Sequence, residues 1–337
     1  MNCETAGPES MSRRLIVFSD PGGAKPCLAL ASKWAEGCEV KTCSDRAYRF
    51  SDGFGVQVEM CGPAEARRIV EDFQPTFLFT GTSYTSRLEL HFLAEAVRRR
   101  IPTAAFVDHY TKFRERFALD GSDLFPDEIH VLDAKAQSLA LEAGLPAERI
   151  RITGNPYHEY LRSFQSKISR KDLLQRIGIS SADVPLFLFA PDPLSNAGGS
   201  KTFGTDESSI LALLLNAIAA QDQPVRLIIK PHPNQNIAML EKTAGEIDSH
   251  GRCQVMLAPP ESDAYVNELI HHSDLVVGIF SSIILEAELL KARTLRVLCG
   301  LTVPDPLENI ARGCAVRDFS SLCRAIEGFA RRDTAAS

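Results

Sequence analysis

The stretch Leu227–Gln235, with the sequence LIIKPHPNQ, decides how this chain is interpreted. Its apolar residues are typical of a buried strand, and the run ends in a loop stiffened by Pro231 and Pro233. Because proline fixes φ and has no N–H to donate, the strand cannot continue, and Lys230 and His232 are expected at its carboxyl end. Open α/β sheets bind ligands at that edge, so the stretch predicts a phosphate-binding loop. A plain strand-to-helix turn with a surface histidine is the alternative.

A second stretch about forty residues later has the same form. A buried strand is predicted at Leu275–Gly278, followed by a turn with Ser281 and Ser282 and then by a helix. Serine hydroxyls and the amides of a helix start are donors that suit a phosphate. Glu286 lies one helical turn after Ser282 and is expected to face the same side. A glutamate on the helix surface is the alternative interpretation, because Glu288 must face elsewhere.

Composition limits the class of protein. A chain of 337 residues, 45% of them hydrophobic, is long enough for two domains of about 150 residues each. The net charge of −6 gives no general basic face, so no nucleic-acid partner is expected. The nine cysteines form no C-x-x-C pair and are interpreted as reduced thiols of a cytoplasmic protein. Residues 1–12 are predicted to be a disordered tail without a secretory signal, and no membrane span is expected.

Strand and helix patterns alternate along the rest of the chain. This alternation predicts an α/β fold with two doubly wound, mainly parallel sheets, in domains at residues 13–160 and 161–337. The last predicted helix, Ser320–Ala330, is expected to pack back on the first domain. The predicted strands are Leu15–Phe18, Glu39–Cys43, Val56–Met60, Thr76–Thr80, Thr103–Val107, Glu128–Val131, Arg149–Ile152, Leu186–Ala190, the strand before Lys230, Cys253–Leu257, Leu275–Gly278 and Thr294–Leu298.

A glycine-rich turn follows the first predicted strand. It contains Asp20, Gly22 and Gly23 and leads into a helical pattern. Paired glycines let the backbone approach a ligand and leave amides free at a helix start, although the turn is not a dinucleotide G-x-G-x-x-G motif. A plain tight turn explains the two glycines equally well.

Two further polar clusters follow predicted strands of the first half. Thr82 and Ser83 come after the fourth strand, and Asp108 comes directly after the fifth, with Arg114 and Arg116 just beyond. The carboxyl ends of parallel strands meet at one sheet edge, so these clusters are expected to converge. The two arginines are candidates for binding an anionic acceptor, or else belong to a charged surface loop.

The connection between the halves is predicted after Thr153–Pro156. Pro156 is expected to prevent a helix from starting at once, and the polar, aromatic segment Tyr157–Ser169 is interpreted as the interdomain connection. The segment Pro191–Thr205 is rich in Pro, Gly, Ser and Asn. It is too long for a simple connection and is a candidate binding loop.

These features together resemble GT-B-fold glycosyltransferases, and the same outline is similar to UDP-N-acetylglucosamine 2-epimerases. The resemblance rests on the two Rossmann-like halves, the glycine-rich first turn, Gly154–Pro156 before the connection, and Glu286 four residues after Ser282. The stretch Lys230–Pro233, with Ser281 and Ser282, looks like the HP and Ser-Ser pair of bacterial sialyltransferases and capsule Kdo transferases. The resemblance implies two Rossmann-like domains facing a cleft.

The resemblance also implies an activity. It points to a metal-independent, inverting glycosyltransferase of polysaccharide biosynthesis that moves a sugar from a CMP-, CDP- or UDP-linked donor to a glycan or small-molecule acceptor. Hydrogen-bond donors and a helix dipole would stabilise the leaving phosphate. The sequence has no D-x-D motif of the kind that binds a metal, so neither metal nor cofactor is expected. The residues expected to bind the donor are Gly22, Gly23, Asn155, Lys230, His232, Ser281, Ser282 and Glu286, and those expected to bind the acceptor are Thr82, Ser83, Arg114 and Arg116.

An inverting transfer needs a base that deprotonates the acceptor, and the first domain is expected to supply it. The candidates are Asp20, Asp108 and His109. Because Asp108 and His109 are adjacent, only one of them is expected to point into the site. Asp20 is an equal candidate, although an aspartate before Pro-Gly often caps the turn that follows it.

Two other classes of function remain open. A 2-epimerase would use the same fold and a UDP-sugar, with a carboxylate pair and an arginine or histidine around the hexose. The usual epimerase turn has Gly-Gly after its serine, where this chain has Ser282-Ile283. A catalytically silent nucleotide-sugar-binding partner subunit would keep the phosphate loop and lack a working base.

Overall fold

A computed structural model of the chain describes residues 12–180, 184–232, 235–247 and 250–330. The predicted tail, residues 1–12, lies outside the described residues except for Ser12, and so do Pro233 and Asn234 of the histidine loop. The chain divides into two compact units, the first ending at Ser163 and the second beginning at Phe164. Within the described part of the chain, no helix is long and apolar enough to cross a membrane.

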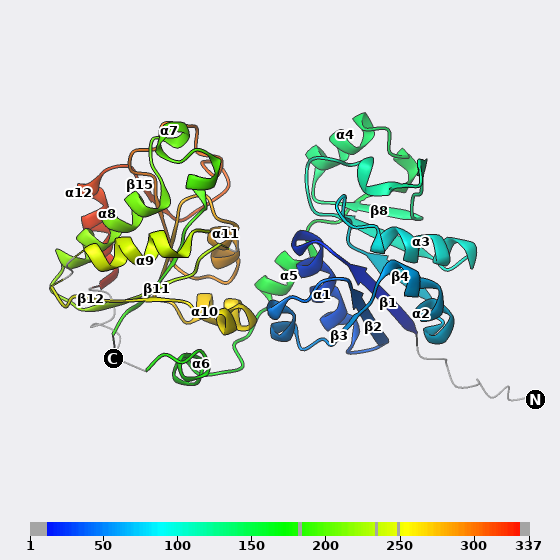
Figure 1. The fold of residues 1–337 in the computed structure, drawn as a ribbon, viewed down its shortest axis with the longest axis horizontal. Coiled ribbons are helices and arrows are strands. Elements are labelled where there is room, and N and C mark those ends of the chain that lie inside the picture. The colour runs from blue at the N-terminus through cyan, green and yellow to red at the C-terminus, as the bar shows by residue number, and fades with distance from the viewer. Residues whose placement is uncertain (1–11, 181–183, 233–234, 248–249, 331–337) are drawn as a thin grey trace, which may run out of the picture. The chain divides into compact units, whose positions relative to one another are not determined.

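The first unit is built on a parallel sheet with the strand order β3-β2-β1-β4-β5-β8-β9 (Figure 1). A separate antiparallel pair, β6 (Ala118–Leu119) and β7 (Ser122–Asp123), follows β5. The strands of the large sheet are β1 (Arg13–Phe18), β2 (Glu39–Ser44), β3 (Val58–Met60), β4 (Phe77–Thr80), β5 (Thr103–Val107), β8 (Glu128–Val131) and β9 (Ile150–Ile152).

Helices cover both faces of this sheet. Leu15 and Val17 of β1 pack with residues of α2 and α3, whereas Ile16 and Phe18 point to the opposite face, and all four side chains are fully buried. Two buried faces are the reason that the strand is a continuous apolar run. The helices are α1 (Pro21–Trp34), α2 (Ala66–Phe73), α3 (Leu88–Arg98), α4 (Ala134–Glu142) and α5 (Pro156–Arg162), and the 3₁₀ turns are η1 (Arg49–Phe54), η2 (Pro63–Glu65), η3 (Glu115–Phe117) and η4 (Ala147–Arg149).

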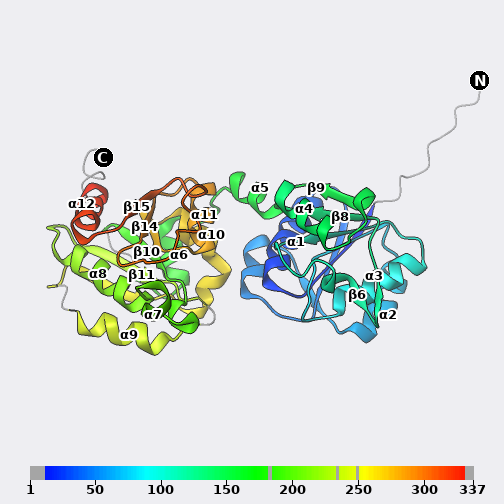
Figure 2. The same ribbon diagram turned by 90° about the horizontal axis from the view of Figure 1, so that it is seen from above.

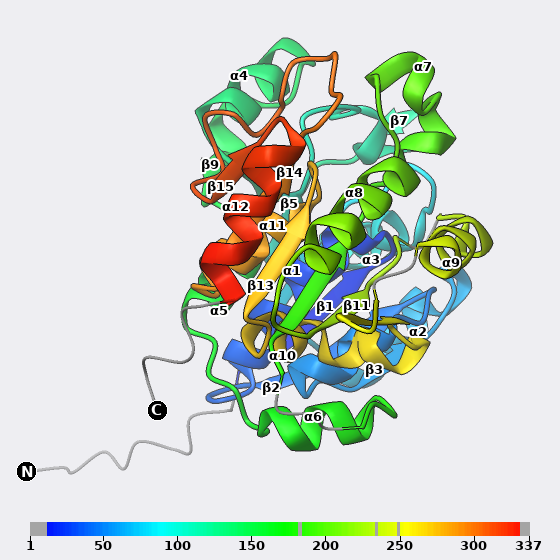
Figure 3. The same cartoon turned by 90° about the vertical axis from the view of Figure 1, so that its left-hand side faces the viewer.

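The second unit repeats this plan with a parallel sheet in the order β12-β11-β10-β13-β14-β15. The helices α8 and α9 pack side by side (Figure 2), and α12 packs on α8 and β15 (Figure 3). The strands are β10 (Leu186–Ala190), β11 (Val225–Ile229), β12 (Cys253–Leu257), β13 (Leu275–Gly278), β14 (Thr294–Val297) and β15 (Cys314–Val316). The helices are α6 (Arg170–Arg176), α7 (Ser200–Phe203), α8 (Glu207–Ala219), α9 (Ile237–Glu246), α10 (Val266–His271), α11 (Ser282–Leu289) and α12 (Phe319–Ala330), with 3₁₀ turns η5 (Leu194–Ala197) and η6 (Pro260–Tyr265).

The predicted fold of two Rossmann-like α/β sheets is confirmed. One local prediction is wrong: Pro156 does not delay a helix but is the first residue of α5, because the first helical position needs no N–H donor. The candidate loop Pro191–Thr205 contains two short helical segments, η5 and α7. The last helix, α12, contributes Leu322 and Ile326 to the core of the second unit, and its expected packing on the first domain stays a prediction.

Candidate functional site

The strand order of the first sheet places its switch point between β1 and β4, where the chain turns to build the other half of the sheet. Ligands of open α/β sheets bind at the carboxyl ends of strands beside such a point. Asp20 follows β1 there, and Gly81, Thr82 and Ser83 follow β4. The fold therefore brings two of the predicted polar clusters together.

Asp20 is the centre of a hydrogen-bond network at this switch point. Its carboxylate accepts from Ser83 Oγ at 2.6 Å, Thr85 Oγ1 at 3.0 Å and Arg46 Nη1 at 3.2 Å. Asp20 precedes α1 at the N-cap position, yet its side chain makes no capping hydrogen bond to the helix. The carboxylate thus joins the loops after β1, β2 and β4.

Asp108 lies directly over the glycine turn. A Cβ atom on Gly22 would come within 1.8 Å of Asp108 Oδ2, so only glycine leaves room for this carboxylate. Arg116 is buried and its Nη1 donates to Asp108 Oδ1 at 3.1 Å and to the Thr82 carbonyl at 2.8 Å. Burial raises the pKa of Asp108, and the charge of Arg116 opposes that shift. Such a carboxylate is a stronger base than an exposed aspartate.

The other predicted residues of the first unit take different positions. Gly23 packs against Gly81, where an added Cβ would lie 3.3 Å from the Gly81 Cα. His109 is exposed, and its Nδ1 lies 2.9 Å from Thr111 Oγ1. Arg114 is also exposed and its guanidinium is bound by Asp123, with the shortest contact at 2.7 Å. Arg116 therefore orients Asp108, whereas Arg114 is held at the surface.

Glu89, in the first turn of α3, is a functional candidate that the sequence analysis missed. The residue is 4% exposed, and its Oε2 accepts from Ser19 Oγ at 2.9 Å. Burial raises the pKa of Glu89 to about 7, and the nearby Asp20 and Asp45 add to the shift. The only signal in the sequence is an acidic residue within the apolar pattern Leu88–Leu93, which by itself is typical of a helix start.

Asn155 lies at the other end of the same sheet edge. Its Oδ1 accepts from the Tyr157 amide at 3.0 Å and so caps α5. Asn155 also lines a cavity of about 360 Å³ beyond the carboxyl ends of β8 and β9. The other lining residues are Tyr110, Leu132, Asp133, Thr153, Gly154, His158, Glu159 and Arg162.

In the second unit, Asp192 connects the two predicted phosphate loops. The switch point of this sheet lies between β10 and β13, and Asp192 follows β10. Its Oδ2 accepts from the Phe280 amide at 2.8 Å, in the turn before Ser281. Burial raises the pKa of Asp192 to about 6, although the amides of Phe280, Ser281 and Ile279 favour the ionised form.

Gln235 completes this connection on the side of the histidine loop. Its Oε1 accepts from the His232 amide at 2.9 Å, and its Nε2 donates to the Asp192 carbonyl at 3.3 Å. Lys230 pairs with Asp263, and burial followed by the charge of Lys230 lowers the pKa of His232. The loops after β10, β11 and β13 are therefore one hydrogen-bonded structure at the carboxyl edge.

The turn with Ser281 and Ser282, after β13, is the third of these hydrogen-bonded loops. Ser281 is the N-cap of α11, but its Oγ lies 3.4 Å from the Ile283 amide, and Ser282 is exposed. Glu286 is buried, whereas Glu288 accepts from the amides of residues 312 and 313. The two glutamates thus face different ways, as their spacing predicts.

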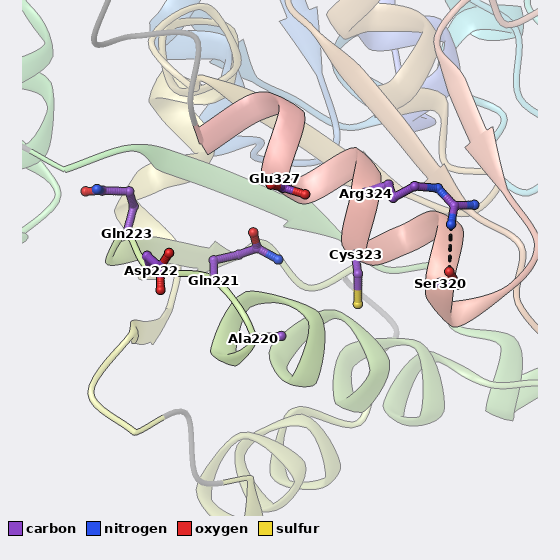
Figure 4. Close-up of a pocket in the computed structure, with 8 residues that line it drawn as sticks. All are labelled: Ala220, Gln221, Asp222, Gln223, Ser320, Cys323, Arg324 and Glu327. Atoms are coloured by element: carbon purple, nitrogen blue, oxygen red, sulfur yellow. Dashed lines mark hydrogen bonds between the residues drawn. The ribbon is translucent and has the colours of Figure 1, made fainter.

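A cavity of about 400 Å³ lies at the opposite edge of the second sheet (Figure 4). Gln221, Asp222 and Gln223 line it from the segment before β11, and Cys323 and Arg324 line it from α12. Arg324 Nη1 donates to Ser320 Oγ at 2.7 Å, so the guanidinium already has a partner. This cavity is remote from the carboxyl edge and takes no part in the candidate site.

The described residues contain no group of three His, Cys, Asp or Glu side chains that is arranged to hold a metal ion. No family model matches the sequence, and no curated protein sequence matches it. Similarity is found among solved structures instead.

The UDP-GlcNAc 2-epimerase from Methanocaldococcus jannaschii matches with a TM-score of 0.62 at 12% identity, over 95% of this chain and 93% of that one. The UDP-GlcNAc 2-epimerase from Neisseria meningitidis bound to UDP-GlcNAc matches with a TM-score of 0.58 at 13% identity, over 94% of each chain. Anabaena Alr3699/HepE in complex with UDP-glucose matches with a TM-score of 0.56 at 15% identity, over 95% and 90%.

The chain has their fold. The GT-B-like fold, with two Rossmann-like sheets in one chain, is shared over nearly the whole length of each chain. Identities of 12 to 15% support the fold alone, so the resemblance of the Lys-Pro-His-Pro and Ser-Ser stretches to sialyltransferases and Kdo transferases gains no support from these structures.

Proposed function

We propose that this protein is an enzyme that binds a UDP-linked sugar and inverts a stereocentre of the hexose. The observation that carries the proposal is the pair formed by Asp20 at the switch point of the first sheet and Asp108 after the neighbouring β5, each bonded to an arginine. Inverting a sugar carbon requires one group that removes a proton and another that returns it from the other face. Two carboxyl groups from the loops after different strands suit those two roles.

The nucleotide is assigned to the carboxyl edge of the second sheet. The loops with His232 and Ser281 are joined there through Gln235 and Asp192. Ser282 is exposed at the start of α11, where hydroxyls and the helix dipole favour a phosphate. Two structural neighbours are complexes with UDP-GlcNAc and UDP-glucose, and this supports a UDP-linked sugar as the ligand.

Glycosyl transfer is the second candidate. It is favoured by Ser282-Ile283 in place of the Gly-Gly of the usual epimerase turn and by the histidine loop itself. A transferase needs a single base, for which Asp108 is suited by its raised pKa. The two reactions differ in one requirement, since transfer consumes an acceptor and epimerisation does not.

The experiment incubates the protein with UDP-GlcNAc, UDP-glucose, CMP- and CDP-linked sugars in D₂O, with and without an acceptor mixture, and follows the products by NMR. An epimerase forms a diastereomer that carries deuterium at the inverted carbon without acceptor. We expect Asp108→Asn and Asp20→Asn to lower turnover at least about 100-fold. The control is Asp72→Asn, since Asp72 lies on α2, before the amino end of β4, and among the described residues its carboxylate bonds only to the exposed Arg68.

The alternatives give different results in the same experiment. If nucleotide is released only when an acceptor is present, the protein is a glycosyltransferase and the epimerase proposal is wrong. Binding of nucleotide without any turnover would identify a silent partner subunit. An active Asp108→Asn variant with native thermal stability would exclude the assigned carboxylates.

A further inference from the structure

The carboxyl group of Glu89 is buried near the Asp20 network, and one of its two oxygens has no hydrogen-bond partner among the described residues. Oε2 accepts from Ser19 Oγ at 2.9 Å, whereas Oε1 has no partner among the described residues. An ionised carboxylate with an unpartnered buried oxygen costs much more free energy than a neutral carboxyl group. The surroundings of Glu89 therefore favour its protonated form.

The charges around Glu89 act in the same direction. Burial is the main cause that raises its pKa to about 7, and the charges of Asp20 and Asp45 contribute in the same direction. Arg46 is the cation of this region, but it is 44% exposed and its guanidinium is bound to Asp20. No described cation pairs with the carboxyl group of Glu89. The titratable and charged groups that surround it are Asp20, which precedes α1, Cys27 in the middle of α1, and Asp45, Arg46 and Tyr48 from the segment after β2.

Ser19 transmits the state of Glu89 to the candidate site. Its hydroxyl is bound by Glu89, its carbonyl accepts from Tyr48 OH at 2.5 Å, and the next residue in the chain is Asp20. Both groups of Ser19 are thus held, and its side chain is fully buried. The direction in which the Asp20 carboxylate leaves the backbone depends on this arrangement.

We infer that Glu89 is a positioning residue that stores a proton at neutral pH and, through Ser19, holds Asp20 in the geometry that the reaction needs. The inference rests on the proposed function. Loss of the proton places another anion beside Asp20 and Asp45. Asp20 is then no longer held in that geometry, and turnover is fastest below the pH at which Glu89 ionises.

Two variants test separately the ionisation of Glu89 and its hydrogen bond to Ser19. Glu89→Gln keeps an acceptor for Ser19 and cannot ionise. Ser19→Ala keeps the carboxyl group and removes its connection to the Asp20 turn. The first measurement is the urea midpoint of the full chain from pH 4.5 to 8.5, which requires no activity.

The sign of the pH effect follows from proton binding. Between the ordinary glutamate pKa and a folded-state pKa of about 7, the folded chain binds a proton that the unfolded chain has lost, so stability decreases as pH rises through that window. We expect the midpoint of wild type and Ser19→Ala to fall with pH relative to that of Glu89→Gln. If the urea midpoints of wild type and Glu89→Gln change with pH by the same amount, Glu89 does not hold a proton in the folded chain.

The second measurement is the pH profile of turnover with the nucleotide sugar that gives activity. We expect the kcat of wild type to fall about ten-fold above pH 7, which equals a coupling of one pKa unit, and the kcat of Glu89→Gln to stay level. Ser19→Ala should lower kcat. A kcat that falls equally in wild type and Glu89→Gln would overturn the role of Glu89. Absence of turnover with every nucleotide sugar would reject the proposed function, while the urea series still decides whether Glu89 holds the proton.

Discussion

Arg114 and Arg116 are two residues apart, yet the fold uses their guanidinium groups differently. Arg116 is 5% exposed and paired with Asp108, whereas Arg114 is 61% exposed and paired with Asp123. Removing one partner of a buried ion pair leaves an uncompensated charge, while an exposed pair contributes little because water and salt screen it. The same substitution at the two arginines therefore compares the contribution of a buried ion pair to stability with that of an exposed one.

We expect Arg116→Met to lower the free energy of unfolding by about 3 kcal/mol, since Asp108 loses its buried partner. Arg114→Met should leave the free energy of unfolding essentially unchanged. Urea unfolding of both variants at pH 7 measures the difference. Equal losses in the two variants would contradict the assigned burial of Arg116.

The sequence indicates the edge on which the site residues lie, but not their partners. Asp20 and Asp108 each follow an apolar run, and a residue at the carboxyl end of a strand reaches the sheet edge whatever the rest of the fold does. That Arg46 and Thr85 bind Asp20, or that Glu89 reaches Ser19 seventy positions away, depends on how loops and helices pack. Such long-range contacts have no local pattern in one sequence.

At the scale of elements, the strands are predicted better than the short helices. Thr103–Val107, Leu186–Ala190 and Cys253–Leu257 are β5, β10 and β12 to the residue, since apolar runs with clear polar boundaries admit one assignment. The three-residue strand β15 and the seven-residue helix α6 are too short for a periodic pattern and were missed.

The helices α8 and α11 begin with caps of different quality. Asp206 accepts from the Ser209 amide at 2.8 Å and from Ser200 Oγ at 2.7 Å, whereas Ser281 reaches the Ile283 amide only at 3.4 Å. A hydrogen bond at that length contributes little to the stability of a helix. The hydroxyl of Ser281 is thus less committed to its own helix than the carboxylate of Asp206.

We expect Asp206→Ala to lower the free energy of unfolding by about 1 kcal/mol through loss of the cap. Ser281→Ala should change stability much less and weaken UDP binding about ten-fold, as a lost hydrogen bond to a charged phosphate does. Urea unfolding and calorimetric titration with UDP measure the two effects. Unchanged UDP affinity in Ser281→Ala would remove that serine from the nucleotide site.

At the scale of the whole molecule, the same strand plan occurs twice. In each unit the first strand is central, the next two lie on one side and the later strands on the other. The proposed division of labour gives nucleotide binding to the second unit and the chemistry to the first. A nucleotide without a sugar should therefore bind to the second unit alone.

We expect UDP alone to slow amide hydrogen exchange chiefly in the loops after β10, β11 and β13. Bound ligand stabilises the folded state by mass action, about 2.7 kcal/mol at one hundred times its Kd, and local protection reports where it binds. Hydrogen exchange followed by mass spectrometry resolves the two units. Protection confined to the loops after β1, β4 and β5 would reverse the assignment.

The separate cores also matter while the chain is being made. All strands of the first sheet lie before Ser163, and at about 5 to 20 residues per second the ribosome then needs on the order of ten to thirty seconds to deliver the other half. During that time the nascent chain carries a complete sheet whose edge strands, β3 and β9, have three residues each. Such short edges offer little template for pairing with a neighbouring nascent chain, although Met60 and Ile152 on them are about half exposed. The length of these two strands thus favours folding of the first half ahead of aggregation on crowded polysomes.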